Sequence, residues 1–356
     1  MKVTLTLIFL HLALLSYLVL CNIDAWADEL TCPNGMTLIN GGTYRMGDNH
    51  SGFVEEKVVE DVSVKDFCID TYEVSNAQFA EFIAATGYKT VAERPLSLEQ
   101  FPDLPDKERA SGSLVFIAPE EGVLQVPYLS WWHWIPGASW QHPQGTESSI
   151  IDMSNYPVVQ VAYEDAEAYA NWAGKQLPTE AQWEYAARGG RFNTIFTWGN
   201  QYSPKQANTW QGKFPFFNQQ QDGFAGIAPV GSFPPNGFGL FDMTGNVWEW
   251  TADWFRIDRR GMEHRFNPSG PSRVASYDPK KPWEGAMHVI KGGSYLCAKN
   301  YCSRYRPVAR ESQAPDTGTS HIGFRLVLDP KSTLGIDINQ LVKDSPDVDK
   351  YVISKF

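Results

Sequence analysis

The sequence predicts an α+β protein in which short helices and strands are joined by long ordered loops. The chain has 356 residues, of which 43% are hydrophobic and 20% are charged, as in a globular rather than a disordered protein. It contains 13 Trp, 29 Gly and 23 Pro, a mixture that suits aromatic side chains packed between irregular segments. The length allows two average domains or one large domain with a substantial core.

The first 27 residues have the pattern of an export signal. Lys2 supplies a positive start, an apolar run follows, and the sequence AWA before Asp28 matches a cleavage site. The apolar run is also nearly long enough to be an uncleaved membrane anchor. Lipid attachment at Cys21 is disfavoured, because the bulky Leu20 stands where a small residue is needed. The folded part is therefore expected outside the cytoplasm: in the periplasm, secreted, or in the secretory-pathway lumen.

Hydrophobic patterns predict the elements of the first half of the chain. The stretch MTLINGGTYRMGD at residues 36–48 predicts a strand and a Gly turn, and residues 62–69 predict an extended segment. Ser75-Asn76 can cap a helix. Residues 95–155 are rich in Pro, Gly and Trp and show no sustained period, which predicts a long ordered insertion.

Two further helices give the clearest signals. One is expected from about Glu164 to a stop at Gly174, and the other from a cap at Thr179 to Gly189. From about residue 197 to residue 328 the sequence predicts turns and short strands. Residues 330–356 differ in composition and are expected to form a helical or flexible tail.

Charge and motif content argue against several classes of protein. The formal net charge is −11, with scattered Lys and Arg, which argues against nucleic acid as a partner. The seven His form no HxH, HxxH or HExxH cluster, so a zinc site is not expected. No Gly-rich nucleotide loop indicates flavin or NAD.

Four cysteines remain after removal of the signal. In an oxidising compartment they predict two disulfides, with three possible connectivities that the sequence alone does not resolve. Cys32 and Cys68 could pair, and Cys297 and Cys302 could close a small loop. The stretch KGGSYLCAKNYCSRYRPVAR at residues 291–310 therefore holds either a disulfide or a pair of thiolates that do chemistry.

A series of short motifs resembles the sulfatase-modifying-factor superfamily. In order, the motifs include GGTYRMGD, DTYEVSNAQFAEFIAATGY, AGKQLPTEAQWEYAARGG, PPNGFGLFDMTGNVWEWTADW, KGGSY and HIGFRLV. The resemblance covers roughly residues 34–329 and implies a single large domain with a modified C-type-lectin-like fold and little regular secondary structure. The tail after about residue 330 has no counterpart.

The segment around the late cysteines resembles formylglycine-generating enzymes, which carry GGSYxCxxxYCxRYR. The resemblance implies a copper-dependent oxidase that uses O2 to convert the cysteine of a CxPxR segment, in an unfolded or partly folded sulfatase, to Cα-formylglycine. Cys297 and Cys302 would be thiolate ligands of Cu(I), a soft metal that prefers sulfur. Ser294 and Tyr301 would be neighbours able to hydrogen-bond the substrate or an oxygen species.

Basic residues near the cysteines are expected to support thiolates. Lys299, Arg304, Arg306 and Arg310 would supply positive charge that lowers the pKa of the thiols, unless they are ordinary surface or structural charges. By resemblance, Arg310 also lies near the substrate groove. His321 borders the groove too, and it stands where many family enzymes have Asn.

The resemblance also implies two structural calcium sites made of hard oxygen ligands. The ligands of the first would be Asn208, Asp222 and the carbonyls of Thr209 and Phe224. The ligands of the second would be Asp242, Glu249 and the carbonyls of Gly245 and Val247. The alternative for Asn208 and Asp242 is that they only cap turns.

Two other functions stay open on the same fold. One is a non-catalytic binding or assembly module in which Cys297–Cys302 is a plain disulfide. The other is an oxidase that matures another peptide or a metabolite. The state of the cysteine pair distinguishes these functions. Further disulfides of several animal relatives are not expected, because the matching positions hold Ala170, Ala187, Pro307 and Leu326.

Overall fold

The computed structural model describes residues 30–57, 60–99, 102–105, 109–120, 122–123, 125–258, 265–281 and 285–332. The chain divides into two compact units, one of residues 1–33 with 330–356 and one of residues 34–329. In the small unit, β1 (Leu30–Thr31) pairs antiparallel with β15 (Lys331–Ser332). The predicted signal at 1–27 and the tail from residue 333 lie outside the described residues. Among those described, no helix has the length and hydropathy needed to cross a bilayer.

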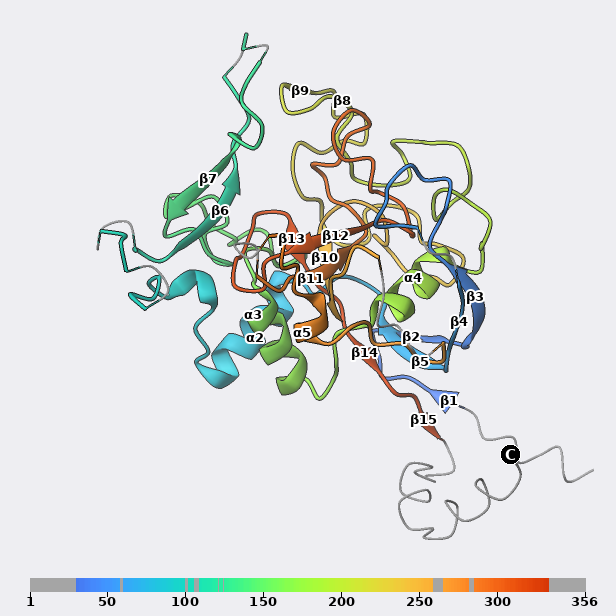
Figure 1. The fold of residues 1–356 in the computed structure, drawn as a ribbon. Coiled ribbons are helices and arrows are strands. Elements are labelled where there is room, and N and C mark those ends of the chain that lie inside the picture. Colours follow the sequence, from blue (N-terminus) through green and yellow to red (C-terminus); the bar gives the residue numbers. More distant parts are fainter. Residues whose placement is uncertain are drawn as a thin grey trace, which may run out of the picture. The chain divides into compact units, whose positions relative to one another are not determined.

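A four-stranded sheet lies in the middle of the large unit (Figure 1). Its strands, in spatial order, are β12 (Arg310–Gln313), β11 (His288–Lys291), β10 (Trp248–Trp254) and β13 (Ile322–Gly323). β11 pairs antiparallel with both β10 and β12, and β13 runs parallel to β10. The cysteine-containing segment is therefore the connection between two neighbouring strands, β11 and β12.

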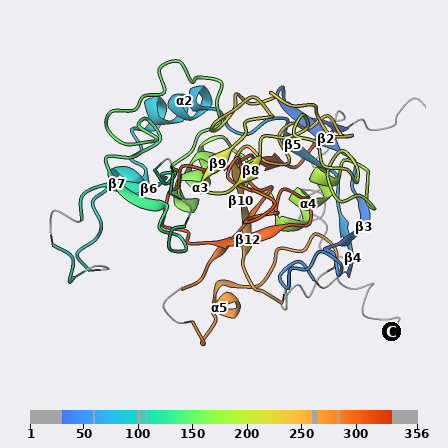
Figure 2. The same ribbon diagram turned by 90° about the horizontal axis from the view of Figure 1, so that it is seen from above.

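The remaining strands form smaller sheets around it. A three-stranded sheet has the order β14 (Val327–Leu328), β5 (Phe67–Asp70) and β2 (Met36–Ile39). Three hairpin-like pairs are β3 (Gly42–Met46) with β4 (Glu60–Val64), β6 (Gly112–Phe116) with β7 (Trp132–Pro136), and β8 (Gly212–Lys213) with β9 (Phe217–Asn218). In both ribbon views β6–β7 and β3–β4 lie on opposite sides of the four-stranded sheet (Figures 1 and 2).

The three helices that the sequence predicts are present within two residues of the expected positions, and two short helices, η2 (Val91–Glu93) and α5 (Arg273–Ser276), were not predicted. The predicted helices are α2 (Asn76–Thr86), α3 (Tyr163–Trp172) and α4 (Glu180–Arg188). Ser75 and Thr179 accept N–H groups of the first turns of α2 and α4, and Gly189 ends α4 with a left-handed backbone. The predicted α+β class is confirmed.

Aromatic side chains form much of the core. Phe79 and Phe82 of α2 are fully buried and pack with Tyr169 of α3 and with Phe324. Burying one such side chain contributes about 1.5–3 kcal/mol, so aromatics stabilise a unit whose loops lack hydrogen-bond ladders. The insertion predicted at residues 95–155 is ordered in its described part and contains the β6–β7 pair, which the sequence did not indicate.

Candidate active site

Two glycines shape the start of the β11–β12 connection. Gly292 and Gly293 have φ values of 96° and 76°, a region that L side chains rarely adopt. A Cβ at Gly292 would lie 3.1 Å from the ring of Trp183, and one at Gly293 would lie 3.0 Å from the backbone of Tyr305. The sequence GG therefore lets the chain turn away from β11 against a packed core.

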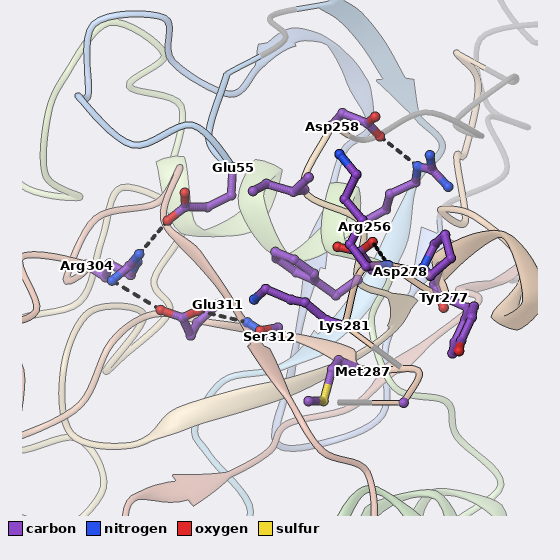
Figure 3. A pocket seen from close by; sticks show the side chains of 16 residues that line it. Glu55, Arg256, Asp258, Tyr277, Asp278, Lys281, Met287, Arg304, Glu311 and Ser312 are labelled. Carbon is purple, nitrogen blue, oxygen red and sulfur yellow. Dashed lines mark hydrogen bonds and ion pairs between the residues drawn. The ribbon is translucent and has the colours of Figure 1, made fainter. Parts of the chain in front are cut away.

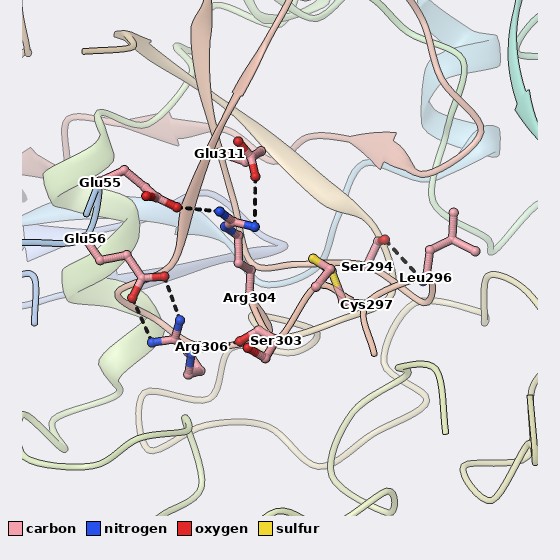
Figure 4. Close-up of a disulfide and its surroundings, with 10 residues drawn as sticks. Glu55, Glu56, Ser294, Leu296, Cys297, Ser303, Arg304, Arg306 and Glu311 are labelled. Carbon is pink, nitrogen blue, oxygen red and sulfur yellow. Dashed lines mark hydrogen bonds and ion pairs between the residues drawn. A yellow bond between two sulfur atoms is a disulfide. The ribbon is translucent and has the colours of Figure 1, made fainter. Parts of the chain in front are cut away.

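Cys297 and Cys302 come together on this connection as a disulfide, with their Cα atoms 4.5 Å apart (Figure 4). Local backbone bonds hold the loop, since Cys297 N donates to Ser294 O at 2.9 Å and Cys302 N to Ala298 O at 2.9 Å. Cys297 is 1% exposed and Cys302 is 9% exposed. The structure thus confirms that the two sulfurs meet, and it shows them in the oxidised state.

Ser294 and Tyr301 flank the pair. The Ser294 hydroxyl is buried and accepts the N–H of Leu296 at 3.3 Å, so its own proton can be donated elsewhere. Burial raises the pKa of Tyr301 to about 12, so its hydroxyl is protonated at neutral pH. Both hydroxyls can donate hydrogen bonds, and their action on a substrate or an oxygen species stays a prediction.

Tyr301 belongs to an aromatic cluster, defined here as Phe116, Trp131, Trp132, Trp210, Phe214 and Tyr301. The Tyr301 ring stacks on Phe214 at 4.3 Å and meets Trp131 edge-on at 5.4 Å. Trp210 N donates to Cys297 O at 3.1 Å, which joins the cluster to the cysteine loop. The aromatic cluster therefore meets the cysteine loop through Trp210 and Tyr301.

His321 lies beside this aromatic cluster. Its ring centroid is 4.7 Å from that of Trp132, and its Nδ1 is 2.9 Å from the Thr319 hydroxyl. Burial lowers the pKa of His321 to about 3, so the imidazole is neutral at physiological pH. A contact of His321 with substrate stays a prediction.

The arginines after the cysteines are neutralised by acidic partners. Arg304 pairs with Glu55 and with Glu311, and Arg306 makes two bonds to the buried Glu56, at 2.6 and 2.8 Å (Figure 4). Each positive charge is matched by a carboxylate, which fits the structural alternative for Arg304 and Arg306, and their effect on the thiol pKa stays a prediction. Lys299 is exposed.

The segment that carries Glu55 and Glu56 packs against the arginines that follow the cysteines. The Phe53 ring lies 4.5 Å from the Arg304 guanidinium and 5.3 Å from that of Arg306. The sequence did not predict this contact, because no local signal connects residues 53–56 with residues some 250 positions later. Glu55, Arg304 and Glu311 also line a pocket of about 530 Å³, whose lining carries both signs of charge (Figure 3).

Arg310 is held inside the large unit. Its Nε and Nη2 donate to Glu180 at 2.8 and 2.9 Å, and its Nη1 donates to Arg256 O at 2.7 Å. These contacts indicate a structural role, tying β12 to the start of α4. The predicted contact of Arg310 with substrate has no support from its position.

Asp222 contacts two other residues of the first predicted calcium site. Its carboxylate accepts the N–H of Thr209 and of Phe224, each at 3.0 Å. The Asn208 amide nitrogen donates to Gly226 O and to Asn246, so its carboxamide oxygen is the atom that could bind a cation. One predicted ligand set therefore lies within a single loop cluster.

The second predicted set lies near a further buried carboxyl group, that of Glu73. Glu249 forms a two-bond ion pair with Arg325, and Asp242 accepts the N–H of Gly231. Gly245 and Val247 lie between these two acids in the chain. Burial, followed by the charges of Asp242 and Glu249, raises the pKa of Glu73 well above its usual range.

Of these three buried acids, only Glu249 contacts the Arg325 guanidinium, and the raised pKa of Glu73 favours its protonated, neutral form. Glu73 lies within the motif DTYEVSN, and the sequence assigns it no role. Among the residues that the structure describes, no three His, Cys, Asp or Glu side chains are close enough to form a metal site by themselves. Both predicted calcium sites combine carboxylates with amide or backbone carbonyl oxygens, and both stay predictions.

The fold and the site define a class: a loop-rich α+β domain that carries a buried cysteine pair on a Gly-started strand connection. The chain belongs to the sulfatase-modifying factor enzyme 1-like family, whose model matches residues 25–330.

Two curated relatives and one solved structure place the chain within this family. The chain is 48% identical over 297 residues to the formylglycine-generating enzyme of Mycobacterium tuberculosis, covering 82% of this chain and 97% of that protein. It is 35% identical over 300 residues to inactive C-alpha-formylglycine-generating enzyme 2 of Bos taurus, covering 82% and 88%. The structure of PvdO from Pseudomonas aeruginosa matches with a TM-score of 0.56 at 24% identity, over 84% of this chain and 97% of that one, and shows the fold alone.

Proposed function

We propose that this protein converts a peptidyl cysteine of a sulfatase to Cα-formylglycine and thereby activates the sulfatase. The observation that carries the proposal is the buried pair Cys297–Cys302, whose Cα atoms are 4.5 Å apart. Reduction of this bond leaves two thiols side by side next to the aromatic cluster. Similarity to relatives named formylglycine-generating enzyme supports the same reaction here.

The reaction requires O2 and a source of two further electrons. Replacing CH2–SH by CHO in the presence of water releases sulfide and two electrons, whereas reduction of O2 to two waters consumes four. A thiol reductant would supply the remaining two electrons and become a disulfide. The same class of reductant would open the Cys297–Cys302 bond before turnover.

The residues present fit Cu(I) as the cofactor. Two thiolates on one loop are soft donors of the kind that Cu(I) selects, and Cys297 and Cys302 would hold the ion. When bound, copper would supply the one-electron chemistry that ground-state O2 requires. The substrate thiolate would be the third sulfur at the site, because the described residues bring no third Cys, His, Asp or Glu to the pair.

The surrounding side chains would orient the substrate and exclude water. Tyr301 keeps its proton, since its pKa is about 12, and it can donate a hydrogen bond. Ser294 can donate its hydroxyl proton from a buried position. The rings of the aromatic cluster would reduce access of water to the reacting sulfur.

The substrate would be the CxPxR segment of an unfolded or partly folded sulfatase, bound as an extended peptide. The protein would act after export through its N-terminal signal. Calcium ions at the two predicted sites would stabilise loops that lack regular hydrogen-bond ladders.

The test is turnover of a peptide. The reduced protein is loaded with Cu(I) and incubated in air with a CxPxR peptide, and the product is analysed by mass spectrometry for replacement of the thiol by an aldehyde. Wild type should form the aldehyde, whereas Cys297→Ser and Cys302→Ser should not. Equal turnover by all three proteins, or none by wild type, would refute the proposal. Peptides that lack the Pro or Arg test whether another peptide is the true substrate.

A non-catalytic module is the second candidate, favoured by the bonded state of the two sulfurs. In that case the disulfide is structural and resists reduction in the folded protein. Thiol titration of the native protein after mild reduction distinguishes the candidates, because the oxidase must expose two thiols while folded.

A further inference from the structure

Tyr128 is an exposed aromatic residue at the edge of the aromatic cluster. It is 75% exposed, although its ring centroid lies 5.8 Å from that of Trp131 and 6.4 Å from that of Tyr301. Tyr301 directly precedes Cys302 in the chain. The ring of Tyr128 therefore extends the apolar surface beside the cysteine pair toward solvent.

The backbone holds Tyr128 at the corner of a turn. Ser130 N donates to Pro127 O at 3.2 Å, and Leu129 has a φ of 64°. Turns with positive φ at this position favour Gly, and a Leu there costs on the order of 1 kcal/mol. Leu129 is itself exposed, so its burial does not offset this cost. This turn holds the Tyr128 ring exposed to solvent.

We propose that Tyr128 is a specificity-determining residue that contacts an apolar side chain close to the reacting cysteine of the peptide substrate. This inference rests on the proposed function, which brings the substrate cysteine to Cys297 and Cys302. An extended peptide advances about 3.3 Å per residue, so a ring 6.4 Å from Tyr301 is within reach of residues one to three positions from that cysteine.

The chemistry of the surface selects an apolar partner. Tyr128 contacts two aromatic rings, and its own ring offers a broad apolar face with few side-chain rotamers to immobilise. A Leu side chain packed on this face loses water from both surfaces. A polar side chain at the same place would gain little.

The test is a cycle of substitutions on protein and peptide. Unreactive peptides, in which Ser replaces the reacting Cys, carry either Leu or Ser at each of the three positions on both sides. Their binding to the reduced, copper-loaded wild type and Tyr128→Ala is measured by fluorescence anisotropy. At one position, changing Leu to Ser should weaken binding to wild type about tenfold and leave binding to Tyr128→Ala unchanged.

A matched variant controls for loss of an exposed ring. Phe266→Ala removes a side chain that is 64% exposed beside β4, on the opposite side of the large unit from β6–β7 (Figures 1 and 2). As in wild type, changing Leu to Ser at that one position should weaken binding to Phe266→Ala about tenfold. If Phe266→Ala matches Tyr128→Ala, or if Leu-to-Ser losses are equal in wild type and Tyr128→Ala at all six positions, the proposal is wrong.

Turnover is measured separately on the cysteine peptides. Tyr128→Ala should raise KM about tenfold for the Leu-containing peptide with kcat unchanged, since an interaction equal in the bound and transition states affects only KM. If the Leu-to-Ser change weakens binding to wild type but not to Tyr128→Ala, and wild type forms no aldehyde, the oxidase activity is refuted while the role of Tyr128 in binding is supported. A loss confined to kcat would overturn that role.

Discussion

Replacing Arg310 separates a structural role from a role in substrate binding. The guanidinium is 1% exposed and donates to both oxygens of Glu180, which is itself buried. Arg310→Met keeps the aliphatic stem but leaves the Glu180 carboxylate without its main partner. Breaking a buried pair in this way costs about 3–5 kcal/mol. Lys291 Nζ, 3.7 Å from Glu180, remains as a weaker partner, so we expect a loss near 3 kcal/mol.

Urea unfolding of four reduced proteins measures this effect. The free energy of unfolding is determined for wild type, Arg310→Met, Glu180→Gln and the double variant. The double variant removes both charges, so it should be more stable than the sum of the single losses predicts, by about 1–3 kcal/mol.

Kinetics complete the comparison at a temperature where each variant is folded. The KM for a CxPxR peptide should change by less than about twofold in Arg310→Met, because the side chain does not reach solvent. A stability loss below about 1 kcal/mol together with a KM raised more than about tenfold would show that Arg310 binds substrate, and our structural assignment would be wrong.

Three further predictions concern charge, calcium and backbone. Burial and then repulsion by Glu180 raise the pKa of Asp253 to about 7. The pKa of Asp253 is higher in the folded than in the unfolded protein, so its ionisation lowers the free energy of unfolding as pH rises. Asn does not ionise. In urea unfolding, the free energy of unfolding of Asp253→Asn should therefore increase by about 1–3 kcal/mol relative to that of wild type from pH 5 to pH 8. An equal difference at both pH values would contradict this. Removing calcium with EGTA should lower Tm by several degrees, reversed by Ca²⁺ but not by Mg²⁺, since binding at a hundredfold excess over Kd adds about 2.7 kcal/mol. An unchanged Tm would exclude both calcium sites. Gly292→Ala should lose about 2 kcal/mol more than Gly174→Ala in urea unfolding, because both have positive φ but only the Cβ at Gly292 would press on Trp183. Equal losses would refute the packing argument.

Local signals predicted the helices well. The capping residues Ser75 and Thr179 and the stop at Gly189 are each set by a few neighbouring residues, and the structure has the helices at those places. The β6–β7 pair was missed because its two strands are short and separated by a long connection without a turn signature.

The site was predicted in part. The cysteine pair, Ser294 and Tyr301 lie within one segment, so the motif predicted that they are close together. The partners of Arg304 and Arg306 come from residues 53–56, and only tertiary structure could reveal them. The sequence shows their charges but not these partners, so it could not decide between support of the thiolates and structural pairing.

The same limit applies to Glu73. It lies far in sequence from Asp242 and Glu249, yet folding places its carboxylate within range of theirs. No local signal in residues 242–249 indicates that this carboxyl group lies nearby.

Titration of the reduced protein with Cu(I), against a chromophoric competitor for the ion, tests whether Cys297 and Cys302 bind copper. Wild type should withdraw one Cu(I) per chain from the competitor, and Cys297→Ser and Cys302→Ser should each lose this ability. Binding that is equal in wild type and both variants, or a native protein whose two sulfurs resist reduction, would contradict the claim that both act as thiolates.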